Sequence, residues 1–255
     1  RGREYTLLPD VMTIVGLIPA RFASVRFPAK PLALLAGKPM VVHVLDAARS
    51  STRLDRVAVA TDDERIAEAV RRAGGEAVMT SLDCASGTDR LAEAARAIPG
   101  DVYVNIQGDE PLMSAANIDS AVDTLMESPD REIASVWVPI PASDSTDPNA
   151  VKVAVAADGR ALYFSRAPIP FPRGGEPEYR KHLGLYAYRA ETLRTIARLP
   201  PSPLERLESL EQLRWLEAGY VIWMGQAASD SIGVDTPEDL AKAEDWMRAR
   251  MEASA

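Results

Sequence analysis

Short apolar runs alternate with stretches that carry helix signals between residues 14 and 107. The first run, 14–18, is short and continuous, which is typical of a buried parallel strand. Pro39 opens one helical stretch and Gly74-Gly75 ends another. This alternation predicts an α/β fold of three layers with a mostly parallel sheet and right-handed crossovers. The expected strands are 14–18, 56–60, 76–80 and 101–107, and the expected helices are 39–48, 63–73 and 89–98. We expect Pro19 to end the first strand and Thr61 to cap the second helix.

The pattern changes beyond residue 130. Strand-like stretches follow one another without a clear helix between them, and the proline-rich segment 166–177 should be extended. This predicts a smaller antiparallel insertion at about residues 130–200 that serves substrate specificity or subunit contact. Since no linker is evident, we expect one domain over 13–250, preceded by an extension over 1–12. The later strands are expected at 132–139, 150–156, 162–165, 182–189 and 220–224, and the later helices at 203–218 and from 237 to the C-terminus.

Composition narrows the function classes. A chain of 255 residues can bury one sizeable core. The net charge of −8 argues against nucleic acid as the main partner, because phosphate backbones require a broad basic face. The single cysteine, Cys84, fits a reducing cytoplasm, and no apolar run approaches the roughly 18 to 20 residues that span a bilayer. We therefore expect a cytoplasmic protein that does not enter the membrane.

A local cationic loop follows the first strand. No acidic residue occurs between Asp10 and Asp46, although the chain as a whole is acidic. Such a loop at the carboxyl end of a first strand suits a bound polyanion such as a triphosphate. Pro28 and Pro31 stiffen the backbone around Lys30 and disfavour a regular helix there. A solvated basic loop would have the same spacing, so the pattern alone leaves both readings open. The cations of this acid-free stretch are Arg21, Arg26, Lys30 and Lys38.

Two aspartates are candidate metal ligands. Gly108 allows a sharp turn after the strand at 101–107, and Asp109 would then project over the edge of the sheet. A carboxylate at this point can hold a hard cation such as Mg²⁺, although a turn aspartate that bonds its own backbone has the same signature. Asp235 precedes a helix that Thr236 and Asp239 already cap. It is therefore either a second metal ligand or a charge that complements the helix dipole.

Glu211 conflicts with the pattern of its predicted helix. At helical spacing it falls inside the apolar arc of the helix at 203–218, and Gln212 lies nearer the edge of that arc. An ionised carboxylate that points at a core must be paired or must bind a polar group. An ion pair with a nearby arginine and a role in ligand binding are both compatible with this position. The arc consists of Leu204, Leu207, Leu210 and Leu213.

The strand at 182–189 offers polar groups on one face. Strand periodicity places Leu183 and Leu185 on the core face and His182 and Tyr186 on the opposite face. The second face suits the wall of a sugar-acid site, although a strand histidine is often merely structural. Neither G-x-G-x-x-G after the first strand nor G-x-x-x-x-G-K-[ST] occurs, which disfavours a dinucleotide-dependent oxidoreductase. Any phosphates would be held by side chains and irregular loop amides.

The sequence resembles the 3-deoxy-manno-octulosonate (Kdo) cytidylyltransferases, also called CMP-Kdo synthetases. The similar segments occur in family order over nearly the whole chain. Two positions depart from the family pattern: Val25 and Ala29 stand where threonine and glycine are usual. The segments include IPARFASVRFPAKPL (18–32), GKPMVVHV (37–44), SGTDRLAE (86–93), NIQGDEP (105–111), ALYFSRAPIP (161–170), HLGLYAYR (182–189), PSPLERLESLEQLR (201–214) and GVDTPEDL (233–240).

The resemblance implies a Rossmann-like nucleotidyltransferase fold and transfer of CMP from CTP to Kdo with Mg²⁺, for the lipopolysaccharide inner core. It also implies a homodimer. The sugar hydroxyl would attack the α-phosphorus in line, with no side-chain general base. Alternatives are a cytidylyltransferase for another acidic sugar, such as 8-amino-Kdo or sialic acid, and a non-catalytic sugar-nucleotide-binding subunit.

The resemblance also assigns roles to individual residues. It implies that Arg21 and Lys30 bind the triphosphate and that Asp109 and Asp235 hold Mg²⁺, so these four form the catalytic set. Further nucleotide contacts are implied for Ala20, Ser86, Gly87 and Gln107, and sugar contacts for Arg26, Arg166, His182, Tyr186, Glu211 and Gln212.

Overall fold

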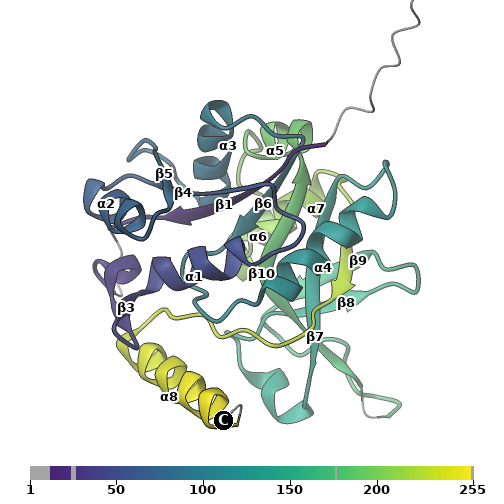
Figure 1. The fold of residues 1–255 in the computed structure, drawn as a ribbon. Helices are drawn as coiled ribbons and strands as arrows, with labels where there is room; N and C mark the ends of the chain where they lie inside the picture. Colours follow the sequence, from purple (N-terminus) through teal and green to yellow (C-terminus); the bar gives the residue numbers. More distant parts are fainter. Residues whose placement is uncertain (1–11, 24–26, 176, 254–255) are drawn as a thin grey trace, which may run out of the picture.

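A mixed sheet of nine strands runs through the molecule and carries helices on both faces (Figure 1). A computed structural model describes residues 12–23, 27–175 and 177–253. The main path of the sheet has the order β11-β7-β10-β6-β1-β4-β5, and β8 and β9 extend it beside β10. The strands are β1 (Ile14–Ala20), β4 (Arg56–Thr61), β5 (Glu76–Met79), β6 (Val102–Ile106), β7 (Ile133–Ile140), β8 (Lys152–Val155), β9 (Ala161–Ser165), β10 (Tyr179–Arg189) and β11 (Ile222–Gln226).

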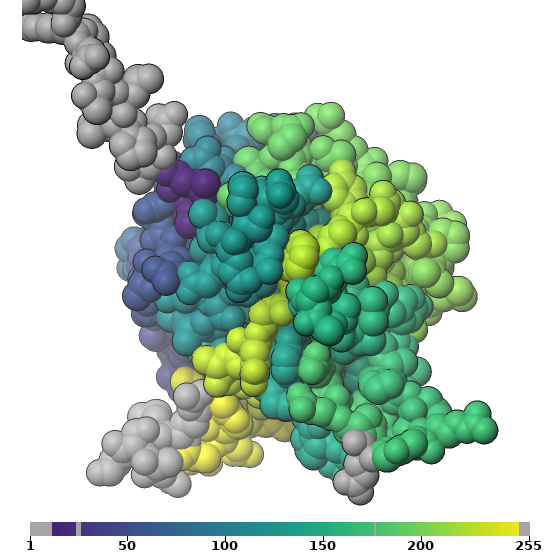
Figure 2. Space-filling model, turned by 90° about the vertical axis from the view of Figure 1, so that its right-hand side faces the viewer, coloured from purple at the N-terminus to yellow at the C-terminus, as the bar shows by residue number. Residues whose placement is uncertain are grey.

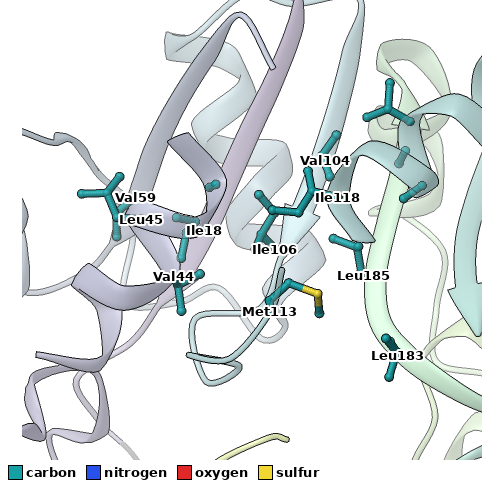
Figure 3. Packing of buried hydrophobic residues seen from close by; sticks show 14 of the residues in the cluster. Ile18, Val44, Leu45, Val59, Val104, Ile106, Met113, Ile118, Leu183 and Leu185 are labelled. Atoms are coloured by element: carbon teal, nitrogen blue, oxygen red, sulfur yellow. The ribbon is translucent and has the colours of Figure 1, made fainter. Parts of the chain in front are cut away.

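The helices cover the sheet in two layers, which confirms the three-layer prediction. One core cluster joins α1, α2 and α4 to the sheet, and Figure 3 shows Leu45 beside Val59 and Ile118 beside Ile106. A second cluster joins α3, α5 and α7 to the other face, where Leu91 and Trp215 are buried. The helices are α1 (Met40–Arg49), α2 (Glu64–Arg72), α3 (Gly87–Ala97), α4 (Ala115–Met126), α5 (Ala190–Ile196), α6 (Pro203–Glu208), α7 (Gln212–Glu217) and α8 (Pro237–Ala253), with 3₁₀ turns η1 (Lys30–Leu32) and η2 (Ala142–Thr146).

The order of the strands creates a crevice beside β1. The chain passes from β1 to β4 on one side and later returns to β6 on the other, and both pairings are parallel. In open α/β sheets, ligands bind outside the carboxyl ends of the strands at the point where the order reverses. The residues that follow β1 and β6 are therefore placed at a natural binding site.

The antiparallel strands predicted for 130–200 are present, and most of them belong to the main sheet. β10 is antiparallel to both β6 and β7 and so links the two halves of the sheet. β11 then pairs parallel with β7 at the edge. Only β8 and β9 lie off the main path. The segment at 130–200 thus completes the sheet instead of forming a separate lobe.

Several expectations about individual elements were wrong or incomplete. β1 continues through Pro19 to Ala20, because β6 pairs only as far as Leu17 and the missing N–H of Pro19 interrupts no ladder there. Asp63 caps α2 in place of Thr61, which belongs to β4. The helices α4 and α5 were not predicted. Their buried faces include polar residues, Asn117 and Thr124 in α4 and Thr192 in α5, which weaken the apolar periodicity.

The helix predicted at 203–218 is two helices. Ser209 adopts a left-handed conformation with φ of 52° and ends α6, and α7 starts at Gln212. The predicted apolar arc is therefore broken, and Leu207 is 82% exposed. No glycine or proline marks the break in the sequence, so periodicity alone extends the helix through it.

A third cluster attaches the C-terminal helix. Val234 and Ala243 pack with Leu35 and Met40, next to the small hairpin of β2 (Leu34–Leu35) and β3 (Lys38–Pro39). The segment between β11 and α8, lime to yellow in Figure 2, crosses the surface as a band. Asn117 of α4 holds it by accepting from Ala228 N and donating to Ser229 O. This route carries the chain back to the crevice. Among the described residues, no helix combines the length and apolarity that crossing a membrane requires.

Candidate active site

A cleft of about 620 Å³ opens at the carboxyl ends of β1 and β6. Its walls come from the loop after β1, the start of α3, the turn after β6, the end of β9 and the segment before α8. Segments far apart in the sequence therefore meet at the switch point of the sheet. The predicted residues that line it are Ala20, Arg21, Lys30, Ser86, Gly87, Gln107, Asp109, Arg166 and Asp235.

Lys30 joins the two aspartates. Its ammonium donates to Asp109 Oδ2 at 2.7 Å and to Asp235 Oδ1 at 2.9 Å. The lysine side chain is 13% exposed, whereas the two aspartates are 37% and 46% exposed. Burial lowers the pKa of Lys30, but both carboxylates raise it, and the net pKa lies above the usual value. The site is therefore a charged triad of one partly buried cation and two more exposed carboxylates, all of which line the cleft.

Close backbone contacts fix the positions of the two aspartates. A Cβ at Gly108 would lie 2.5 Å from Pro19 O, so only glycine lets this turn approach β1 so closely. Val234 N donates to Asp109 O at 2.8 Å, which ties the segment before α8 to the same turn. At the start of α8, Thr236 and Asp239 form the predicted capping box. The side chain of Asp235 is not part of this capping box and lines the cleft.

The loop that carries Lys30 is held by a strained residue. Ala29 has φ of 56° and ψ of 23°, the left-handed region that favours glycine. Its N–H donates to Phe22 O at 3.2 Å, and its carbonyl accepts from Leu32 N at 2.8 Å. Lys30 starts η1, so the predicted absence of a regular helix holds. Arg26 and Val25, which were also singled out in this loop, lie outside the described residues.

The triad fits a hard divalent cation. Asp109 and Asp235 offer carboxylate oxygens, the ligands that Mg²⁺ prefers. Both oxygens contact the same nitrogen of Lys30, so the two carboxylates already converge on one cationic centre. No group of three or more histidine, cysteine, aspartate or glutamate residues that could hold a metal occurs among the described residues. A cation here would therefore need additional ligands from phosphate oxygens and water.

The N-terminus of α3 forms another wall. Ser86 caps the helix by accepting from Asp89 N at 3.1 Å, and Asp89 accepts from Ser86 N in return. Gly87 follows at the first helical position and lines the cleft beside Gln107. The start of a helix carries partial positive charge and attracts anions. This wall is therefore suited to a nucleotide.

Arg90 is a cleft residue that the sequence analysis missed. Its guanidinium donates to Asp62 Oδ2 at 2.8 Å, and both side chains are almost fully buried. Asp62 also accepts from Phe22 N at 3.2 Å, in the loop after β1. The pair thus links α3 to the cationic loop. Its only signal in the sequence is a charged residue inside the apolar face of α3, next to Leu91.

Arg166 occupies the opposite end of the cleft. Its guanidinium donates to Glu208 O at 2.7 Å, Pro148 O at 2.8 Å and Ser209 O at 3.3 Å. An arginine has five N–H donors, so these three bonds fix its plane and leave donors for a ligand. Arg166 follows β9 and bonds residues at the end of α6, so its orientation depends on segments far apart in the sequence. It is consistent with the predicted binding of a sugar acid.

Glu211 lies behind the start of α3. Its Oε2 accepts from Thr88 Oγ1 at 2.8 Å, and burial raises its pKa above the usual value. Arg214 Nη2 is 4.0 Å from Glu211 Oε1, so an ion pair with an arginine is present at long range. Gln212 is 5% exposed. The carboxylate is thus paired with a hydroxyl and a distant cation, beside the nucleotide wall.

His182 and Tyr186 are buried below the cleft. The predicted alternation along β10 is confirmed, because Leu183 and Leu185 pack in one core cluster and Tyr186 in the other. The second face is also core, which corrects the expectation of an open wall. His182 is 8% exposed and its Nε2 lies 2.9 Å from Ser135 Oγ. Burial lowers the pKa of His182 to about 3, so the imidazole is neutral.

Glu110 is a second residue that the sequence analysis left without a role. Burial raises the pKa of Glu110 to about 7, and the adjacent Asp109 charge adds to this. A Cβ at Gly184 would lie 3.0 Å from Glu110 Oε1, so glycine in β10 makes room for the carboxylate. The E-P pair after Asp109 looks like an ordinary turn in the sequence. Only the non-local packing of β10 against this turn shows that the carboxylate is enclosed.

Comparisons with known proteins agree with this geometry. Residues 15–226 match the family model described as cytidylyltransferase. The 3-deoxy-manno-octulosonate cytidylyltransferase of Syntrophobacter fumaroxidans is 53% identical over 236 residues, which cover 90% of this chain and 94% of that protein. The enzyme of the same name from Acidobacterium capsulatum is 49% identical over 241 residues, 94% and 98% of the two chains. A solved structure of CMP:2-keto-3-deoxy-manno-octonic acid synthetase complexed with CTP has a TM-score of 0.89 at 42% identity, and it covers 93% of this chain and 99% of that one.

Proposed function

Since this chain belongs to the cytidylyltransferase family, we propose that it transfers CMP from CTP to Kdo and releases pyrophosphate. The observation that carries this proposal is the convergence of Lys30, Asp109 and Asp235 on one cleft. A cationic loop, a helix start and two carboxylates together match the needs of a metal-bound triphosphate. The relatives named for this reaction match over nearly their whole length, which supports Kdo as the acceptor.

The nucleotide is proposed to lie between the loop after β1 and the start of α3. Arg21 and Lys30 would neutralise phosphate charge, and the N-terminus of α3 would add its backbone dipole. Ala20, Ser86, Gly87 and Gln107 line the same part of the cleft. In-line transfer of a phosphoryl group requires mainly positioning and neutralisation of charge. These residues supply both without a covalent intermediate.

Asp109 and Asp235 would hold Mg²⁺. When bound, the ion neutralises charge on the phosphates and lowers the pKa of a coordinated hydroxyl. The two carboxylates fit this role because both face the cleft and converge on the same nitrogen. Lys30 is then free to move toward a phosphate, because its flexible stem lets a single charge turn between partners.

The sugar acid is proposed to occupy the end of the cleft that Arg166 lines. The free N–H donors of Arg166 would bind the carboxylate, with Glu211 and Gln212 near the sugar hydroxyls. The C2 oxygen of Kdo attacks the α-phosphorus, the bond to the bridging oxygen of pyrophosphate breaks, and the hydroxyl proton passes to solvent. His182 is not a candidate base for this step, because it is enclosed beside Ser135. His182 and Tyr186 would instead support the floor of the sugar site.

The product suits the synthesis of the lipopolysaccharide inner core in a Gram-negative cytoplasm. We propose that setting for this enzyme, together with a homodimeric assembly, on the strength of the family resemblance. The net charge of −8 accords with small-molecule substrates in preference to nucleic acid.

A panel assay tests the proposed reaction. Pyrophosphate release from CTP and Mg²⁺ is measured with Kdo, 8-amino-Kdo and sialic acid as acceptors. We expect the kcat/KM for Kdo to exceed that of the other two by about tenfold or more, since a site built for particular hydroxyls rejects analogues. A higher kcat/KM for another acid would identify that acid, and not Kdo, as the substrate. Release that does not depend on any sugar acid would refute the proposal.

A further inference from the structure

Lys152 is a buried cation outside the cleft. It lies on β8 and is 0% exposed. Its ammonium donates one hydrogen bond, to Asp147 O at 2.7 Å, and within the described part of the chain it makes no ion pair with a carboxylate. An ammonium buried with a neutral partner costs several kcal/mol of stability. An apolar side chain of similar length would avoid this cost, so the charge itself requires an explanation.

Lys152 and Arg166 are connected through one short turn. Lys152 holds the carbonyl of Asp147, and Arg166 Nη1 donates to the next carbonyl, Pro148 O, at 2.8 Å. Arg166 also directly follows Ser165, the residue that pairs with Lys152 in the β8–β9 ladder. The same turn therefore links a buried ammonium to the guanidinium that lines the cleft.

Charged groups of both signs surround this turn. Burial lowers the pKa of Lys152 and Arg166 adds to that shift, whereas Asp147 and Glu208 oppose it. Glu208 is occupied by β9, because it accepts from Ser165 Oγ at 2.7 Å and from Arg166 N at 2.9 Å. Arg166 lines one end of the cleft, whereas Lys152 does not line it and lies close to the carboxylates of Asp147 and Glu208.

We propose that Lys152 is a positioning residue for the acidic sugar, which it serves by holding the 147–148 turn that orients Arg166. This inference rests on the proposed function, which supplies the sugar carboxylate. Lys152 does not touch the substrate in this arrangement. Its effect is transmitted through the 147–148 turn, whose Pro148 carbonyl accepts from Arg166.

The substitution Lys152→Met tests the role of the charge. Met keeps the length of the side chain and removes the ammonium. We expect the KM for Kdo to rise at least about tenfold, which corresponds to about 1.4 kcal/mol. The KM for CTP should stay within about twofold, and the melting temperature should hold or increase, because the buried charge is gone.

Lys181→Met is the matched control. Lys181 faces Lys152 across the β8–β10 pairing but bonds Asp230 and Ser231, away from Arg166. It should leave both KM values within about twofold, since it removes only a partly exposed ion pair. If Lys152→Met fails to fold, Lys152→Gln is measured instead, with the same expected KM for Kdo.

Three outcomes decide the inference. A selective increase in the KM for Kdo, absent from the control, supports it. An unchanged KM for Kdo in the folded variant overturns it, and so does an equal increase in both KM values with a lower melting temperature, which would indicate a structural role alone. If the wild-type enzyme itself does not use Kdo, the proposed function fails, which this assay distinguishes from failure of the Lys152 inference.

Discussion

Lys30 occupies the position between two carboxylates that a cation would take. Its ammonium contacts Asp109 and Asp235 at 2.7 and 2.9 Å, so a free divalent ion must compete with a covalently attached charge. A triphosphate removes the conflict, because it offers Lys30 a new partner and offers the metal further oxygens. We therefore expect the metal and the nucleotide to bind together in preference to the metal alone.

Replacement of Lys30 by methionine should separate these effects. We expect Lys30→Met to bind Mn²⁺ in the absence of nucleotide at least about tenfold more tightly than the wild type, since two nearby carboxylates lose their counter-charge. The binding of CTP should weaken. The affinity for Mn²⁺ is measured by electron paramagnetic resonance of the free ion. The double variant Lys30→Met/Asp109→Asn is the control, and its Mn²⁺ affinity should fall back toward that of the wild type. Equal Mn²⁺ affinity in Lys30→Met and wild type would contradict the competition.

Ala29 gives a prediction about stability. Its φ of 56° is unfavourable for any residue with a Cβ, so Ala29→Gly should raise the free energy of unfolding by up to about 1 kcal/mol. Ala33 has φ of −58°, and Ala33→Gly should lower it, because glycine only adds freedom to the unfolded chain there. Urea denaturation of both variants measures the contrast. If Ala29→Gly and Ala33→Gly lowered the free energy of unfolding by the same amount, Ala29 would not be strained.

Individual site residues could be predicted from the sequence when local structure gave no reason for their charge or their position. Lys30 stood in an acid-free loop between prolines, and Asp235 preceded a helix that was already capped. Glu110 gave no such signal, and the only sign at Arg90 was its place inside the apolar face of α3. Arg90 is paired with Asp62, and Glu110 is enclosed by Gly184. Both partners are distant in the sequence, and the local pattern contains no information about such contacts.

At the scale of elements, the break between α6 and α7 places Glu211 at the start of α3. Ser209 turns the chain with φ of 52°, so Glu211 approaches Thr88 where a continuous helix would have carried it along the apolar arc. The anomaly at Glu211 was evident in the sequence, but the break was not, because Ser-Leu-Glu contains no helix breaker. The polar partner that the sequence analysis required for this carboxylate is Thr88 Oγ1.

Glu211→Gln tests whether this carboxylate serves the sugar. The substitution keeps the size and removes the charge that accepts from Thr88 Oγ1. We expect the KM for Kdo to increase about tenfold, since charge-assisted hydrogen bonds contribute roughly 1.5–3 kcal/mol. The KM for CTP should change little. Steady-state kinetics in both substrates measures this, and the reverse pattern would place Glu211 in the nucleotide site.

His182 on β10 predicts a dependence of stability on pH. Its pKa is about 3 in the folded protein, below the ordinary value of 6.5, so the unfolded chain binds a proton that the folded protein does not. Stability from this group is present above pH 6.5 and is lost as pH falls toward 3, by up to about 1.4 kcal/mol per pH unit.

A comparison with His182→Gln isolates the contribution of His182 to the pH dependence of stability. The free energy of unfolding of the wild type, minus that of the variant, should decrease from pH 6.5 to pH 4 in urea titrations. Glu110 titrates with the opposite sign, since its pKa is raised to about 7, but it contributes equally to both proteins. A constant difference over this pH range would show that His182 titrates normally.

At the scale of the whole molecule, the alternation of strands and helices was sufficient to predict the layers. The order of the strands was not predictable, because β10 enters between β6 and β7 by pairings that join residues far apart in the chain. Hydrophobic pattern defines which face of a strand is buried but not which strand lies beside it. The cleft follows from that order, so its full lining required the structure.

The whole arrangement makes one central claim: Lys30, Asp109 and Asp235 form a single site that joins CTP to Kdo. Phosphorus-31 NMR of a mixture of enzyme, CTP, Kdo and Mg²⁺ tests it most directly. We expect the wild type to produce a CMP-Kdo phosphodiester and pyrophosphate in equal amounts, and folded Asp109→Asn to be slower by about 100-fold or more, because a metal-binding charge is worth several kcal/mol. Near-normal turnover by Asp109→Asn, or conversion of CTP to CMP without the sugar phosphodiester, would contradict the claim.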